Sequence, residues 1–180
     1  MANEKSNKLL TALVIGGFGA IIYEAMTLLP VQLTPEEDKA LQDAADKLGV
    51  AKEWLYGVMY FESTLNPQAF NSVTGATGLI QFVPTTAKDI GTTTEDLMQM
   101  DFTEQIPYVV KYLQRYMPFY NFIDLYLAVF YPAAIKRTDD YQFPSAVAKA
   151  NPGYAVEGVV TKGGIAEILS SRLAKANIRV

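Results

Sequence analysis

The hydrophobic pattern of the chain begins with a long apolar run at residues 9–29, which contains a single charged residue, Glu24. As a helix these 21 residues would measure about 31 Å, close to the roughly 30 Å hydrocarbon core of a bilayer. We therefore expect a membrane anchor over 9–29, while a cleaved signal peptide and a buried core helix remain alternative interpretations. The flanking charges place the following domain on the extracytoplasmic, periplasmic side: Lys5 and Lys8 before the run, and Glu36, Glu37 and Asp38 after it.

After this run, apolar positions recur mainly at helical spacing. Thr34 as N-cap, Pro35 at the first helical position and Gly49 beyond the last turn predict a helix over 35–48. The apolar stripe of this helix consists of Leu41, Ala44, Ala45 and Leu48.

Further helices are predicted along the rest of the chain, over 51–63, 85–89, 121–134 and 165–176, and from Asp101 or Thr103 to 116. Within the helix that ends at 116, Pro107 is expected to cause a kink or to delay the start of the helix. Residues 66–77 are rich in Asn, Ser, Thr and Gly and indicate a loop, with a small hairpin possible in the 66–83 region. The pattern predicts two units, an N-terminal tip and anchor at 1–30 and a mainly α, compact domain at 31–180.

Composition narrows the possible chemistry. The 180 residues include no histidine and no cysteine, which excludes Ser-His-Asp and Cys-His sites, ordinary zinc sites and disulfides. Acid–base chemistry would have to use Asp, Glu, Lys or Tyr. The net charge is −4 and no basic block is present, so binding to nucleic acid is not expected.

Glu62 is the candidate for this chemistry. It lies near the end of the helix predicted over 51–63, where the partial negative charge of the helix C-terminus disfavours a carboxylate. Apolar residues precede it at Val58, Met59 and Phe61, so burial would also disfavour the charged form. Both effects predict a raised pKa, which suits a general acid.

The surrounding motifs resemble those of the lytic transglycosylase and goose-type lysozyme superfamily. The chain has Glu62-Ser63 at a helix end, then GATGLIQ at 75–81 and FVPTTA at 82–87. In the family, a Glu-Ser dipeptide is followed by Gly-Ala-x-Gly-Leu-Met-Gln and then by x-x-Pro-x-Thr-Ala. The third family motif, an Ala-Tyr-Asn triplet, corresponds to LAVFYP at 127–132, where Phe-Tyr replaces Tyr-Asn. The resemblance spans roughly residues 34–135 and implies a lysozyme-like fold.

The resemblance also implies the reaction and the residues that perform it. The expected activity is cleavage of the β-1,4 bond between N-acetylmuramic acid and N-acetylglucosamine in peptidoglycan, with a 1,6-anhydro product and no cofactor or metal. Glu62 would be the single catalytic residue. Gln81 and Ser72 would bind the substrate, Tyr131 would lie near the cleft, and Ser63 would contact substrate or, more naturally, support the helix end.

Other functions remain open at this point. A hydrolytic lysozyme would need a second carboxylate, for which Asp89, Asp96, Asp101 and Asp124 are available. A non-catalytic membrane or virion assembly protein with the same fold is a further alternative. The small single domain favours a phage-encoded enzyme for wall penetration or lysis, with membrane or virion partners and a membrane-anchored or virion-associated location.

Overall fold

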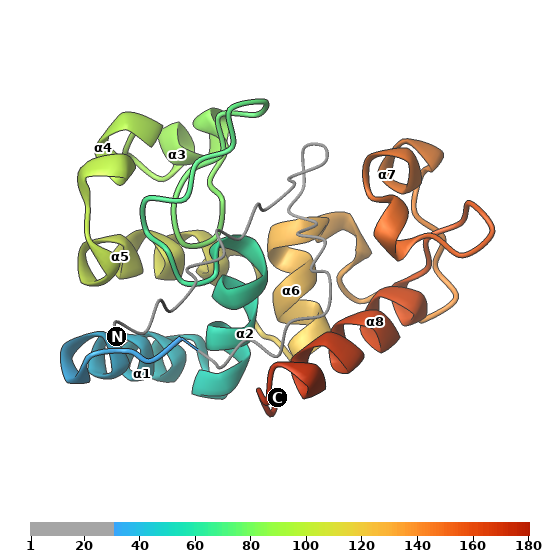
Figure 1. Cartoon of the computed structure of the whole chain (residues 1–180), viewed down its shortest axis with the longest axis horizontal. Helices are drawn as coiled ribbons and strands as arrows, with labels where there is room; N and C mark the ends of the chain where they lie inside the picture. The colour runs from blue at the N-terminus through green and yellow to red at the C-terminus, as the bar shows by residue number, and fades with distance from the viewer. Residues whose placement is uncertain (1–30) are drawn as a thin grey trace, which may run out of the picture.

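The computed structural model describes residues 31–180, which fold as helices joined by loops (Figure 1). The expected anchor at 9–29 lies outside the described residues. Within 31–180, none of the helices has the length and apolar character needed to cross a bilayer. In the region where a hairpin was possible, the described chain forms only isolated bridges, Phe70 with Thr77 and Thr77 with Phe82.

The first two helices agree with the sequence pattern. Helix α1 runs from Pro35 to Leu48, and its N-terminus is closed by a capping box in which Thr34 and Glu37 bond each other's backbone N–H. Gly49 ends it in the left-handed conformation, at φ 64°. The predicted stripe of α1 is buried, and helix α2, Lys52–Ser63, follows directly.

The middle of the chain contains more helices than the pattern predicted. Helix α3 is Pro84–Asp89, and α4, Thr94–Gln99, is an additional short helix that begins at the N-cap Thr93. Helix α5 is Phe102–Leu113, with Asp101 as its N-cap and Pro107 inside it, so the proline does not delay its start. A 3₁₀ turn, Gln114–Tyr116, extends it to the predicted end.

Helix α6 is shorter than predicted because a proline follows it. It runs from Phe122 to Phe130 and is followed by a 3₁₀ turn at Pro132–Ala134. A residue that precedes proline avoids the helical conformation, which accounts for the end of the helix before Tyr131. The fold is completed by helix α7, Ser145–Ala150, a third 3₁₀ turn, Pro152–Tyr154, and helix α8, Lys162–Lys175.

Helix α2 occupies the middle of the molecule (Figure 1). It packs on α1 on one side and on α6 on the other, and α1 also packs on α5. Every residue of α2 from Gly57 to Ser63 is buried. In Figure 1 the C-terminal turn of α2 lies between two groups of helices, α3 to α5 and α6 to α8.

The C-terminal residues 141–180 are attached to α6 by a buried ion pair. Lys162 Nζ lies 3.0 Å from Asp124 Oδ1, and both side chains are more than 90% buried. Asn121 also contacts Asp124 through its side-chain amide, at 3.4 Å. Since a buried carboxylate without its cation is costly, this pair couples α8 to the start of α6.

We predict that Lys162→Met lowers the free energy of unfolding by about 3 kcal/mol, because Asp124 is left buried and uncompensated. Lys39→Met is the matched control, since Lys39 forms an exposed ion pair with Asp43 that contributes at most about 0.5 kcal/mol. Urea unfolding of both variants measures the difference. Equal stability of the two variants would contradict the role assigned to the buried pair.

Candidate active site

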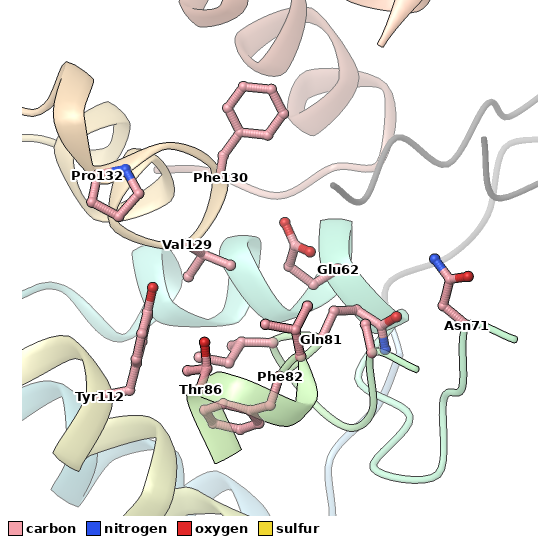
Figure 2. A pocket seen from close by; sticks show the side chains of 12 residues that line it. Glu62, Asn71, Gln81, Phe82, Thr86, Tyr112, Val129, Phe130 and Pro132 are labelled. Atoms are coloured by element: carbon pink, nitrogen blue, oxygen red, sulfur yellow. The ribbon is translucent and has the colours of Figure 1, made fainter. Parts of the chain in front are cut away.

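A cavity of about 130 Å³ lies beside the C-terminal turn of α2. Its walls come from α2, the loop between α2 and α3, the start of α3, and residues of α5 and α6 (Figure 2). Pockets that enclose a whole small ligand are usually larger, about 300–1,000 Å³. A cavity of this size admits one group of a larger substrate rather than a whole sugar chain.

Glu62 projects its carboxyl group into this cavity (Figure 2). The residue is only 6% exposed, and the desolvation that accompanies burial raises its pKa from 4.5 to about 8. Within residues 31–180, no hydrogen bond or ion pair to the carboxylate offsets this loss of hydration. The carboxyl group is therefore mostly protonated at neutral pH.

The apolar surroundings of Glu62 come from aromatic side chains. Phe61 packs edge-on against Tyr126 of α6, with ring centroids 6.1 Å apart. Phe130 forms the facing wall of the cavity and stacks on Tyr126 at 5.6 Å. The structure thus supplies the buried setting that the sequence around Glu62 predicted.

Ser63 supports the end of α2 and does not line the cavity. Its hydroxyl lies within hydrogen-bond distance of two backbone carbonyl oxygens, those of Met59 at 3.1 Å and Leu79 at 2.9 Å. The second contact connects α2 to the Gly78–Gln81 turn. Of the two roles predicted for Ser63, the geometry matches support of the helix end and not contact with substrate.

Ser72 is exposed on the loop and does not line the cavity, and its neighbour Asn71 does. The Asn71 side-chain oxygen accepts hydrogen bonds from the backbone N–H groups of Val73 and Thr74, at 3.0 and 3.3 Å. These bonds turn the chain so that Asn71 faces inward and Ser72 faces solvent. The position assigned to Ser72 from the motif is thus one residue away from the side chain that reaches the cavity.

Gln81 lines the cavity, as the motif predicted. Its backbone has φ 54°, in the left-handed region, and its side-chain Nε2 donates to the carbonyl oxygens of Ala69 and Gly78, at 3.3 and 3.1 Å. Two bonds to backbone fix the orientation of the amide. The remaining polar atom of the side chain, Oε1, is left for the cavity.

Tyr131 does not line the cavity, although Phe130 and Pro132 on either side of it do. Its ring packs edge-to-face on Phe143, with centroids 5.3 Å apart. Because α6 ends at Phe130, Tyr131 leaves the helix on a different side. Tyr131, which was expected near the cleft, thus lies between two lining residues without lining the cavity itself, and Phe130 provides an apolar wall there.

Gln105, which was not predicted as a site residue, has a fully buried side chain that holds the cavity loop to α5. Its Oε1 accepts from Leu79 N at 2.9 Å, and its Nε2 donates to Pro67 O and Leu97 O, at 2.6 and 2.8 Å. The sequence does contain a signal that Gln105 is buried. Gln105 is a polar residue on the apolar face of an amphipathic helix, three positions after Phe102.

Gln105 also explains why position 78 is glycine. A Cβ at Gly78 would lie 2.4 Å from Gln105 Oε1, closer than any side chain tolerates, and the backbone there has φ 83°. The glycine of the motif is thus required by a close approach as well as by its backbone conformation.

A comparison with protein families matches residues 39–140 to the transglycosylase SLT domain. The match covers more than half of the chain and includes Glu62, Asn71, Gln81, Gln105 and Phe130. Residues 141–180 lie outside it. A search of curated proteins gives no significant match.

We predict that Gln105→Leu lowers the free energy of unfolding by about 3 kcal/mol, because Leu79 N, Pro67 O and Leu97 O lose buried partners. Gln99→Leu is the matched control, since Gln99 is exposed at the end of α4. Thermal and urea unfolding measure the effect. A Gln105→Leu protein as stable as the Gln99→Leu protein would show that the loop is held by other contacts.

Proposed function

The chain belongs to the SLT family of peptidoglycan lytic transglycosylases, and we propose that Glu62 acts as both the acid and the base of its reaction. The observation that carries the proposal is a carboxyl group in the cavity whose pKa is raised to about 8 by burial. At neutral pH such a group holds the proton that a leaving glycosidic oxygen must receive.

The proposed reaction needs one carboxyl group and no water. Glu62 first donates its proton to the oxygen of the β-1,4 bond between N-acetylmuramic acid and N-acetylglucosamine, and the bond from that oxygen to the anomeric carbon breaks. The resulting carboxylate then removes the proton from the 6-hydroxyl of the muramyl sugar. That hydroxyl oxygen bonds the anomeric carbon, which closes a 1,6-anhydro ring and returns Glu62 to its protonated state.

The surroundings of Glu62 support this reaction over hydrolysis. A hydrolase needs a second carboxylate near the cleaved bond, and among residues 31–180 Glu62 is the sole acidic residue in the cavity wall. Of the other candidates, Asp124 is buried in the ion pair with Lys162, and Asp101 caps the N-terminus of α5. Neither is available to activate a water molecule beside Glu62.

We predict that Glu62→Gln lowers peptidoglycan cleavage by about 10³-fold or more, because the amide cannot transfer a proton. Glu53→Gln, an exposed substitution in the first turn of the same helix, should keep full activity. Mass spectrometry of the released fragments checks the reaction type. Substantial cleavage by a folded Glu62→Gln protein, or fragments with reducing ends instead of anhydro ends, would refute the proposal.

The pH dependence of the reaction follows from the same group. Below pH 8 the free enzyme carries protonated Glu62, and above it the protonated fraction falls about tenfold per pH unit. We therefore predict that kcat/KM is nearly flat around neutral pH, falls to about half near pH 8 and declines further at higher pH, with circular dichroism confirming that the protein stays folded. A value of kcat/KM that stays constant to pH 10 would contradict the role of the protonated acid.

We further propose that the enzyme is phage-encoded, is anchored to a membrane by residues 9–29, and acts from the extracytoplasmic side in wall penetration or lysis. The apolar length of this run and the charges on its flanks support the proposal. Carbonate extraction of membranes from cells that express the full chain tests the anchor. Release of the protein into the soluble fraction, or a mature mass that lacks the run, would exclude a retained anchor.

A further inference from the structure

The end of helix α6 leaves one backbone carbonyl without its helical partner. In an α-helix each carbonyl oxygen accepts from the N–H of the residue four positions later, which for Ala128 is residue 132. Residue 132 is proline, which has no N–H to donate. Ala128 is fully buried, so bulk water cannot supply the missing donor.

Tyr112 of α5 supplies this donor from another wall of the cavity. Its hydroxyl donates to Ala128 O at 2.8 Å. Figure 2 shows the Tyr112 side chain in the cavity wall, with its hydroxyl directed toward Val129 and Pro132. The bond therefore joins α5 to the last turn of α6 and occupies the carbonyl oxygen beside the cavity.

This bond leaves the α6 side of the cavity poorly suited to holding a water molecule. The residues that α6 and the following turn contribute to the wall are all apolar: Val129, Phe130 and Pro132. A phenol carries one hydrogen, and that of Tyr112 is already directed to Ala128 O. Burial raises the pKa of Tyr112, and the charge of Glu62 adds to the effect. The phenol thus stays protonated and lies within electrostatic reach of the catalytic carboxyl group.

We propose that the Tyr112 hydroxyl determines the product of the reaction, because it occupies the place beside Glu62 where Ala128 O would otherwise hold a water molecule. The inference rests on the proposed function, in which the 6-hydroxyl of the muramyl sugar is the nucleophile. Water held at Ala128 O would compete with that hydroxyl. The water oxygen would bond the anomeric carbon, one water proton would pass to the Glu62 carboxylate, and the product would carry a reducing end.

Tyr112→Phe removes the hydroxyl and keeps the ring. Ala128 O is then buried without a donor, and a buried carbonyl that lacks a protein partner is usually satisfied by ordered water. The carbonyl oxygen and the Glu62 carboxylate are the two acceptors to which such a water can donate. Tyr112 is therefore a specificity-determining residue, which selects the 6-hydroxyl over water, while Glu62 remains the acid and the base.

The test measures which nucleophile ends each turnover. The full-length wild-type and Tyr112→Phe proteins cleave peptidoglycan strands in ¹⁸O-labelled water, and mass spectrometry compares anhydro ends with labelled reducing ends. We expect the labelled share to rise about tenfold or more in Tyr112→Phe, because a bridging water binds nearly as well as a direct hydrogen bond. Tyr108→Phe, at a partly buried tyrosine of the same helix, is the matched control and should give the wild-type ratio.

A loss of folded protein or a slower turnover lowers both products by the same factor, so an unchanged ratio in Tyr112→Phe overturns the proposal whatever the absolute rates. If Tyr112→Phe does not fold, the wild-type protein is given strands in which a methyl ether blocks the muramyl 6-hydroxyl. Intact strands recovered from the complex with the protein support the exclusion of water, and labelled reducing ends overturn it. Failure of the proposed function is seen separately, as reducing ends that the wild-type protein releases from unmodified strands.

Discussion

The arrangement of the site depends on three hydrogen bonds made by one buried side chain, that of Gln105. The loop between α2 and α3 has no regular secondary structure to hold it, so its position must come from side-chain contacts. Gln105 joins this loop to α5 through Leu79 and Pro67 and also binds the end of α4 through Leu97. From Leu79 the connection continues to Ser63 and thus to the helix that carries Glu62.

The setting of Glu62 is made by residues that are distant in sequence. Phe130 closes the cavity opposite the carboxyl group, and it is itself packed by Phe143 and Tyr154, at 5.9 and 5.6 Å between ring centroids. Both of these residues lie in the segment that the family match leaves out. Residues 141–180 therefore contribute to the active site indirectly, because they support the wall that keeps water from Glu62.

The sequence was most informative where the signal is local. Caps, a proline and a glycine defined α1, and the apolar run before Glu62 predicted its burial. Helix α6 is shorter than its apolar pattern predicts, because Pro132 disfavours a helical conformation at Tyr131. The short helices α4 and α7 were missed because six residues are too few to show a helical period, and the equally short α3 was predicted only because Gly91 closes it.

The differences between the predicted site residues and the residues that line the cavity arise from contacts that no linear pattern encodes. Counting along the motif selected Ser72, but two hydrogen bonds to the side chain of Asn71 decide which residue faces inward. Tyr131 was selected as a polar substitute, but its direction depends on where α6 ends. Gln105 forms hydrogen bonds with Leu79 and Pro67, which lie 26 and 38 positions earlier in the chain. Residues so far apart in sequence come together only in the folded structure.

Burial of Glu62 also links folding to proton uptake. An unfolded chain releases the Glu62 proton near pH 4.5, whereas the folded chain keeps it to about pH 8. Between these values folding takes up a proton, so this group's contribution to stability is complete below pH 4.5 and declines by about 1.4 kcal/mol per pH unit up to 8. The desolvation that prepares the carboxyl group for proton transfer thus makes the fold itself sensitive to alkali, and a mildly acidic medium favours both the native state and its reactive form.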